Sequence, residues 1–315
     1  MPHDFLHNHP QFADLIRIVA EEKGIDPALV EKDYWIMHCL YGLQQLGYTF
    51  QLKGGTSLSK GHQIISRFSE DIDILIEPPA GQHVMRGKNH DKPPHRQSRK
   101  DFFDWLAQSI KIDGISPVER DTAFDDVPGY RSGGIRLKYA SVTEPMAGLR
   151  DGVLLEAGFD QVAPNTSKDI SSWLYDRAIA SNVEIIDNRA KAVPCYDPGY
   201  TFVEKLQTIS TKFRKQQEDK SDPVGFMRHY YDVYELLHVP EVQKFIGTPE
   251  YIQHKQKRFR GENQNITENQ AFILSDATTK ALYAKAYERS SGLYYSKKPS
   301  FDEILAEIGK WANKL

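Results

Sequence analysis

The sequence predicts an α+β fold, with a mixed or antiparallel sheet flanked by helices and followed by a mostly helical C-terminal region. Two observations support this prediction. Short stretches of apolar residues within residues 48–159, one of them alternating with acids, are typical of strands. In Gly199–Leu237 apolar residues recur instead at helical spacing. We therefore predict a sheet-containing domain with N-terminal helices at residues 1–190 and a mainly helical domain at residues 191–315.

Length and composition indicate a globular protein without a membrane segment. Of the 315 residues, 40% are hydrophobic and 26% are charged, which is ordinary for such proteins. The formal net charge of -3 gives no global attraction for nucleic acid, so any such binding needs local basic patches. Cys39 and Cys195 form no disulfide or zinc-binding pattern, and no secretion leader or apolar run of about 20 residues occurs. We expect a cytoplasmic protein.

The stretch Leu52–Ile76 organises the chain, and it predicts a strand, a glycine turn, a short helix and a second strand. Gly54-Gly55 follows the first strand, and glycine allows a tight turn that a ligand can approach closely. Hydroxyl residues are expected to cap the helix, at Leu58–Ile65, whose free N–H groups suit an anion. The residues expected to bind the phosphates are Lys53, Gly54, Gly55, Thr56 and Ser57.

The second strand, Asp71–Ile76, carries two acids. Side chains alternate along a strand, so Asp71 and Asp73 share one face while Ile72 and Ile74 point into the core. Two neighbouring carboxylates repel each other unless a cation lies between them. A simple turn and a solvated strand face would explain each part alone, but their order favours a phosphate cradle beside a metal site. We expect a nucleoside triphosphate (NTP) bound with Mg2+ or Mn2+.

This order of residues resembles the signature of the DNA-polymerase-β-like nucleotidyltransferases, although the spacer is longer than usual. The strings KGGTSLSK and RFSEDIDI, with EKDYW at Glu31–Trp35, resemble one branch, the AbiEii/AbiGii toxins of type IV toxin–antitoxin and phage-defence systems. The resemblance runs from about Asp26 to Leu237. It implies nucleotide transfer to the 3′ end of tRNA, and a cognate antitoxin as partner. It also places Glu31–Trp35 near the nucleotide, whereas the alternative is that its charged residues face solvent.

Three later stretches are predicted as antiparallel strands: Ile115–Arg120, Gly134–Ala140 and Gly152–Phe159. Glu156 lies between apolar neighbours in the last of them. The resemblance implies a third metal-binding acid on such a neighbouring strand, and the alternative is an edge glutamate that faces water. Three carboxylates on adjacent strands can hold two Mg2+ ions across a reacting phosphate. The predicted metal ligands are Asp71, Asp73 and Glu156.

The helical region after Gly199 carries lysines that suit a triphosphate. Lys205 and Lys212 recur at roughly helical spacing, and each ammonium group offers three donors. The strings EKLQT and RHYYDVYEL resemble the family's later motifs. The resemblance implies that Lys205 contacts the phosphates and that Asp232 lies at the active site, where it orients a base or contacts the nucleotide. A surface lysine and a helix-stabilising acid are the alternatives. The sequence departs from the family at His229, which receives no role.

Two basic segments are candidates for RNA contact. Arg86–Lys100 is predicted as a basic loop near the triphosphate site, and His254–Gly261 combines basic residues with Phe259. The alternative for both is solvated surface. Further elements are expected as helices at Gln11–Lys23, from Asp26 onward, at Asp101–Ile110, Lys168–Ser181, Glu241–Lys257, Ala277–Arg289 and Phe301–Leu315, and as a short strand at Val183–Ile186.

The leading hypothesis is a metal-dependent nucleotidyltransferase toxin. A small-molecule acceptor is the alternative within the same chemistry, and a nucleotide-binding regulatory protein on an inactive scaffold is the alternative from another class. The intact glycine turn and acid pair argue against an inactive scaffold. A metal-dependent nuclease would need further acids or histidines beside the acid pair, and the sequence offers no convincing set. The predicted catalytic residues are Asp71, Asp73, Glu156, Lys205 and Asp232.

Overall fold

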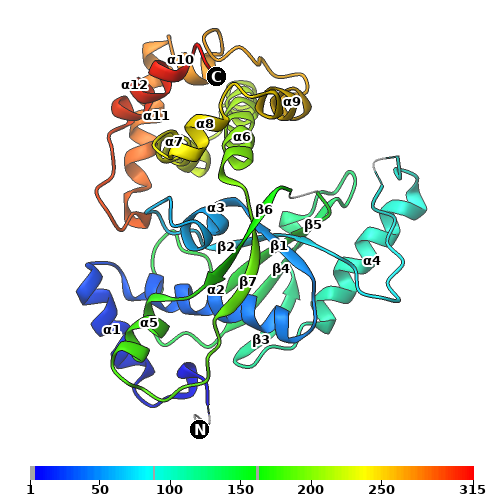
Figure 1. Cartoon of the computed structure of the whole chain (residues 1–315), viewed down its shortest axis with the longest axis vertical. Helices are drawn as coiled ribbons and strands as arrows, with labels where there is room; N and C mark the ends of the chain where they lie inside the picture. The colour runs from blue at the N-terminus through cyan, green and yellow to red at the C-terminus, as the bar shows by residue number, and fades with distance from the viewer. Residues whose placement is uncertain (1–3, 88, 161–162) are drawn as a thin grey trace. The chain divides into compact units, whose positions relative to one another are not determined.

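A computed structural model describes residues 4–87, 89–160 and 163–315, and the chain divides into two compact units. The first unit comprises the chain up to His62 together with Ser69–Tyr196. The second unit comprises Gln63–Phe68 together with Asp197–Leu315. A mixed sheet with helices lies in the first unit and helices make up the second (Figure 1), which confirms the α+β class. None of the helices described is both long and apolar enough to span a membrane.

The sheet of the first unit has seven strands in the order β3-β4-β5-β2-β1-β7-β6. Strand β2 lies at its centre, antiparallel to β1 and parallel to β5. Residues at the middle of the sheet are therefore fixed by hydrogen bonding on both sides. The strands are β1 (Phe50–Lys53), β2 (Asp71–Ile76), β3 (Ile115–Arg120), β4 (Ser132–Tyr139), β5 (Val153–Gly158), β6 (Asn165–Ile170) and β7 (Ala190–Tyr196).

Helices α2 and α4 pack on the sheet, α2 against β5 and β7 and α4 against β3 and β4. The helix expected from Asp26 onward is α2, and Asp26 caps it, because its carboxylate accepts a 2.9 Å hydrogen bond from the Ala28 N–H. The helices of the first unit are α1 (Phe12–Lys23), α2 (Pro27–Gln45), α3 (Gly54–Thr56), α4 (Pro93–Ser109) and α5 (Trp173–Ala180). Shorter helical turns lie at Leu6–Asn8, Ser57–Gly61 and Thr122–Phe124.

In the second unit, α6 packs against α7 and α9, and α7 also contacts α11 and α12. The helices are α6 (Pro198–Asp219), α7 (Val224–Leu237), α8 (Pro240–Phe245), α9 (Pro249–Arg258), α10 (Gln270–Ile273), α11 (Ala277–Arg289) and α12 (Phe301–Trp311), with a turn at Ser291–Leu293. The segment Gln63–Phe68 is held to residues 293–295 by backbone hydrogen bonds, from Phe68 N–H to Leu293 at 2.7 Å and from Tyr295 N–H to Ser66 at 3.1 Å.

The structure corrects several predicted elements. Residues 165–170 form strand β6, so the helix predicted at Lys168–Ser181 begins only at Trp173. No strand forms at Val183–Ile186, and β7 follows instead. Polar β6 lies at the sheet edge and lacks apolar alternation, and β7 contains Pro194, which argues against a strand in sequence. The helix predicted at Glu241–Lys257 is broken, because Gly247 adopts a φ of +83° before α9 starts at a proline.

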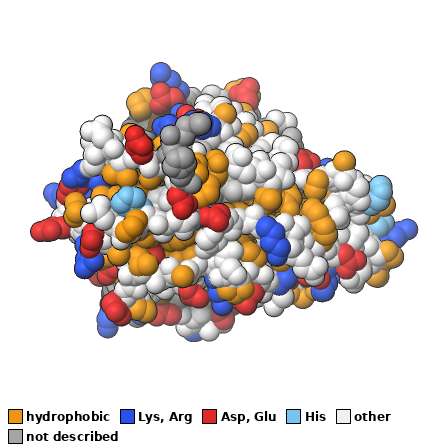
Figure 2. Space-filling view, turned by 90° about the horizontal axis from the view of Figure 1, so that it is seen from below, with side chains coloured by type: hydrophobic (Ala, Val, Ile, Leu, Met, Phe, Trp, Pro, Cys, Tyr) orange, Lys and Arg blue, Asp and Glu red, His pale blue; other side chains and the backbone are white. Residues whose placement is uncertain are grey.

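The two basic segments are also partly built into the fold. The predicted loop Arg86–Lys100 becomes helix α4 from Pro93 onward, and its residue 88 lies outside the part of the chain that is described. Arg99 is fully buried and donates hydrogen bonds to the backbone carbonyls of Met85, His90 and Gly129. In the second segment Phe259 is fully buried, so it is not available to stack on a base. Figure 2 shows basic, acidic and apolar side chains interspersed on the face that it presents.

Helix α2 buries the three consecutive charged residues Glu31, Lys32 and Asp33, so the alternative that they face solvent is wrong. The Glu31 carboxylate accepts three hydrogen bonds from residues 141–143: from the Ser141 hydroxyl at 2.8 Å, the Val142 N–H at 2.9 Å and the Thr143 hydroxyl at 2.7 Å. These bonds hold the start of the loop that joins β4 to β5.

Replacing Glu31 with glutamine should loosen this loop. The amide keeps the size of the side chain but loses its charge and turns one acceptor into a donor, which we expect to lower the free energy of unfolding by about 1–3 kcal/mol. Hydrogen–deuterium exchange should rise in peptides covering residues 140–152, and urea unfolding should give the change in stability. The exposed Glu22 provides the control as Glu22→Gln. Unchanged exchange in the loop would show that Glu31 does not hold it.

Candidate active site

A row of charged residues crosses the middle of the sheet in the first unit. In the strand register, Asp73 of β2 is the direct partner of Lys53 on β1 and of Glu156 on β5. Partners in register point to the same face, and Asp71 shares that face two residues earlier. The backbone thus brings together the acid pair, the third acid that the resemblance implied and the lysine before the glycine turn.

Gly54 lies against this row in a conformation that only glycine adopts easily. Its φ is +70°, and an added Cβ would overlap the Asp73 carboxylate. The helical stretch begins here and ends at Gly61, so the helix predicted at Leu58–Ile65 is misplaced. Thr56 does not cap it but donates a 2.5 Å hydrogen bond from its hydroxyl to the Asp71 carbonyl, which ties the turn to β2. Gly55 and Ser57 are buried within the same turn.

Asp71 is buried, and the guanidinium group of Arg150 lies beside it, with Nη1 3.4 Å from Asp71 Oδ2. The preceding residue, Glu70, accepts hydrogen bonds from the Lys32 ammonium at 3.2 Å and the Arg150 N–H at 3.0 Å. Burial raises the pKa of Glu70, but Lys32 and the Arg150 N–H outweigh burial and hold it below its usual value. Glu70 is therefore ionised at neutral pH.

Helix α2 also supports the far end of the glycine turn. Asp33 forms an ion pair with Lys60, at the end of the helical stretch, and accepts a 2.9 Å hydrogen bond from the Trp173 N–H. Together with Lys32, which reaches Glu70, these contacts attach the turn and the start of β2 to the same helix. Glu31–Trp35 therefore lies beside the candidate site within the first unit.

The predicted metal ligands have the right chemistry, but their side chains do not lie close enough together to share one ion. Carboxylate oxygens are the ligands that Mg2+ prefers, and the strand register places three of them on one face. Across residues 4–87, 89–160 and 163–315, however, no three His, Cys, Asp or Glu side chains lie close enough together to hold an ion. Like charges repel without a cation, and Asp71 is engaged by Arg150. The donor set therefore has the chemistry that Mg2+ prefers, and the strand register places it on one face of the sheet.

The second unit contains a separate buried cluster around Asp232. Its carboxylate accepts two hydrogen bonds from Arg67, at 2.6 and 2.7 Å, and forms a 2.9 Å ion pair with Lys205. Burial raises the pKa of Asp232, but the two cations outweigh burial and keep it below its usual value. The structure thus brings Lys205 and Asp232 together, whereas the alternative of a surface lysine is wrong. Lys212, further along α6, is exposed.

His229 also belongs to this cluster. Its Nδ1 lies 3.4 Å from the Lys205 ammonium. Burial, together with the charge of Lys205, lowers the pKa of His229 well below its usual value, so the ring is neutral at pH 7 and can accept a hydrogen bond. The residue at which the sequence departs from the family therefore contacts the predicted phosphate-binding lysine.

No individual role was predicted from the sequence for Lys32, Arg67, Glu70, Arg150 or His229, although the resemblance placed Glu31–Trp35 near the nucleotide. A signal for Lys32 was present, because Glu31–Asp33 interrupts a helix that is otherwise apolar on nearly every side. Arg67 and Glu70 lie within the string RFSEDIDI, but nothing local shows which partner they reach. Arg150 lies in a loop without periodicity, and the sequence gives no sign of its position.

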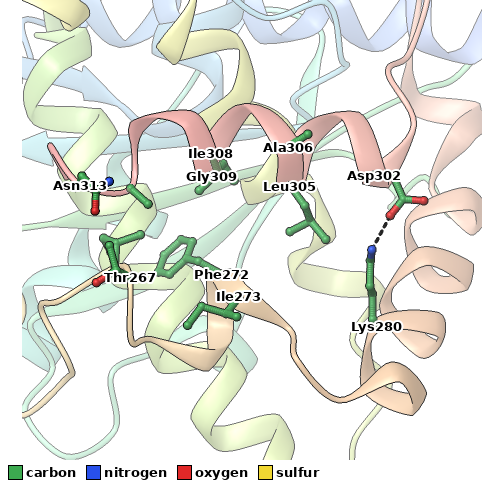
Figure 3. A pocket seen from close by; sticks show the side chains of 12 residues that line it. Thr267, Phe272, Ile273, Lys280, Asp302, Leu305, Ala306, Ile308, Gly309 and Asn313 are labelled. Carbon is green, nitrogen blue, oxygen red and sulfur yellow. Dashed lines mark ion pairs between the residues drawn. The ribbon is translucent and has the colours of Figure 1, made fainter.

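A pocket of about 580 Å3 lies elsewhere in the second unit, between α10 and α12. Figure 3 shows that Phe272, Ile273 and Leu305 line it and that Lys280 and Asp302 form an ion pair at its edge. None of the predicted site residues lines this pocket. We therefore assign it no part in the candidate active site.

An acid row beside a glycine turn, on an α+β sheet, is the arrangement expected of a nucleotidyltransferase. The sequence model of the family described as "Nucleotidyl transferase AbiEii toxin, Type IV TA system" matches residues 36–307, well over half of the chain. The chain therefore belongs to the AbiEii family of nucleotidyltransferase toxins. This match confirms the family that the motifs in Leu52–Ile76 indicated.

Comparisons with curated proteins and with solved structures add no further evidence on the family. No curated protein matches the chain. Among solved structures, the chain is similar to an antigenic nucleotidyltransferase-like protein from Paracoccidioides brasiliensis, with 16% sequence identity and a TM-score of 0.35. That match covers 73% of this chain and 88% of the other. At this score the likeness carries no argument.

Replacing Gly54 with alanine should cost more than backbone strain alone. A left-handed alanine costs about 1–2 kcal/mol, and at Gly54 the methyl group must also displace the Asp73 carboxylate. Gly24 is the matched control, because its φ is +64° and nothing lies within 4 Å of an added Cβ. Urea unfolding should show a larger loss for Gly54→Ala than for Gly24→Ala. The excess should shrink when Asp73→Ala is also present, and equal losses in the two single variants would contradict the contact.

Replacing Asp232 with asparagine should destabilise the second unit strongly. The change leaves two buried cations without their anion, which we expect to cost about 3–5 kcal/mol. Asp222→Asn is the control, because it breaks an exposed ion pair with Arg289, worth at most about 1 kcal/mol. Chemical unfolding of both variants gives the comparison. Similar small losses would mean that the Asp232 cluster is hydrated and adaptable.

Proposed function

We propose that this toxin transfers a nucleotidyl group from an NTP to an acceptor hydroxyl, with Mg2+ or Mn2+ bound by Asp71, Asp73 and Glu156. The observation that carries the proposal is the register of three strands, which aligns Lys53, Asp73 and Glu156 beside the glycine turn. The family supplies the reaction class and the toxin–antitoxin setting. The divalent cation, the NTP and the acceptor are the parts that are proposed.

In the first unit, some residues would bind the triphosphate and others would position the metal. The turn at Gly54 and Gly55 lets a triphosphate approach the backbone closely, and Lys53 adds a positive charge on the same row as Asp73. Bound Mg2+ supplies charge neutralisation at the phosphates and lowers the pKa of the attacking hydroxyl. In this proposal the three acids position the bound metal beside the triphosphate, where its charge stabilises the transition state.

The proposed reaction is an in-line displacement at the α-phosphate. The acceptor hydroxyl oxygen forms a bond to the α-phosphorus, and the bond from that phosphorus to the bridging oxygen of the β-phosphate breaks. Pyrophosphate leaves with the electron pair, and the hydroxyl proton passes to solvent. No covalent intermediate on the protein is required, so the chain's contribution is orientation and electrostatics.

The Lys205 cluster supports a contact with phosphate. One carboxylate, Asp232, faces two cations, Arg67 and Lys205, so the cluster has a surplus of positive charge that an anionic group would neutralise.

We propose the 3′ end of tRNA as acceptor and a cognate antitoxin as partner. The support for both is the family, since Arg99 and Phe259 of the two basic segments are buried.

Transfer of radioactive label from each α-32P-labelled NTP, tested separately with Mg2+ and total tRNA, measures this activity. We expect one NTP or a subset of them to label tRNA with the wild-type protein. Asp71→Asn and Asp73→Asn should reduce the rate at least about a hundredfold, because each removes charge from the metal site. Removal of the metal with EDTA should have the same effect.

The control and the contrary outcomes separate the alternatives. Glu22→Gln, an exposed change elsewhere in the first unit, should leave the rate unchanged. Label that enters only small molecules in a cell extract would favour the small-molecule acceptor. Metal-dependent NTP binding without transfer to any acceptor would favour a regulatory protein on an inactive scaffold. Absence of NTP binding would refute the proposed role of Leu52–Ile76.

A further inference from the structure

The backbone of Arg150 is fixed on both sides by buried charged groups. Its N–H donates a 3.0 Å hydrogen bond to Glu70, and its carbonyl accepts a 2.7 Å hydrogen bond from the Lys32 ammonium. Lys32 is fully buried, and Glu70 is nearly so. Hydrogen bonds to charged groups are stronger than neutral ones. The Cα of Arg150 therefore stays beside the start of β2, whatever its side chain does.

The side chain of Arg150, by contrast, is loosely held. It is 43% exposed, and its Nη1 lies 3.4 and 3.5 Å from the two carboxylate oxygens of Asp71 and 3.9 Å from Glu70. These distances exceed those of strong charge-assisted hydrogen bonds. The guanidinium group also lies over the ring of Phe124, with 4.9 Å between its carbon and the ring centroid. A weak ion pair on an anchored backbone is easily exchanged for another partner.

A neighbouring arginine shows the difference. Arg136 on β4 donates two hydrogen bonds to Asp121, at 2.6 and 3.1 Å, and only 11% of its side chain is exposed. Arg136 is therefore paired with Asp121, which is not one of the predicted metal ligands. Arg150 is instead paired with Asp71, one of those predicted ligands.

We propose that Arg150 is an exchangeable counterion, which occupies Asp71 until a divalent cation takes its place and then binds the triphosphate that the cation brings. Two cations compete for one carboxylate, so metal binding at Asp71 displaces the guanidinium group. The displaced group stays within reach because its backbone is anchored, and a planar guanidinium fits phosphate oxygens well. Arg150 thereby couples metal binding to NTP binding. This inference rests on the proposed function and adds a residue that positions the triphosphate.

The test measures binding, with Mn2+ alone and then with inorganic triphosphate, which carries the charges of an NTP without its base. For Arg150→Ala, the affinity for Mn2+, from the electron paramagnetic resonance signal of the free ion, should rise about three- to tenfold because the competitor is gone. The affinity for triphosphate at saturating Mg2+, from calorimetry, should fall about tenfold. Arg150→Lys should keep a near wild-type Mn2+ affinity and lose part of the triphosphate affinity, because lysine lacks the planar fork.

Arg177→Ala is the matched control, since Arg177 has similar exposure (38%) and pairs with Glu22 on the surface of the same unit. It should change neither affinity. A structural role of Arg150 would lower the thermal stability and leave Mn2+ binding unchanged or weaker, and this result would overturn the inference. Unchanged triphosphate affinity in Arg150→Ala would overturn it as well. If Mn2+ binds and Asp71→Asn abolishes binding, such a failure concerns Arg150 alone, whereas absence of Mn2+ binding in the wild type refutes the proposed function too.

Discussion

Buried charge is the constraint on which the first unit depends. A charged side chain inside a protein is unfavourable unless it is paired, and α2 buries three of them in succession. Each finds its partner in a different segment: Glu31 in the β4–β5 loop, Lys32 in the residues around β2, and Asp33 at the end of the glycine turn. The helix thus holds together the segments that form the candidate active site.

The second unit also pairs its buried charges, but its positive and negative charges are not equal in number. In the first unit, Lys32 and Glu70 neutralise each other, which suits a supporting role. In the second unit, the single negative charge of Asp232 is paired with two positive charges, those of Arg67 and Lys205. The ring of His229 is neutral and adds no negative charge. Well-packed apolar residues often stabilise a protein interior as much as buried charged groups do, so stability alone does not explain the surplus of positive charge. The surplus is therefore the feature of this unit that points to an anionic ligand.

The sequence was informative where chemistry is local. The alternation in Asp71–Ile76 predicted which acids share a face, and helical spacing predicted α6 and α7. The register that aligns Asp73 with Glu156, 83 residues later in the chain, depends on strands joining in the order β5-β2-β1, which no local pattern encodes. Arg67 and Arg150 were missed for the same reason, because their partners are distant in the chain. Strand β7 was missed because Pro194 suggested a break.

The assignment of Gln63–Phe68 to the second unit bears on how the protein is made. This segment precedes β2 in the chain, yet its backbone partners lie at residues 293–295 and the partner of its arginine is Asp232. A ribosome releases residues 63–68 long before those partners exist. The Arg67 guanidinium therefore cannot pair with its carboxylate until Asp232 has been synthesised. A chain that ends before Asp232 would therefore lack this cluster and would leave the Arg67 guanidinium without this carboxylate.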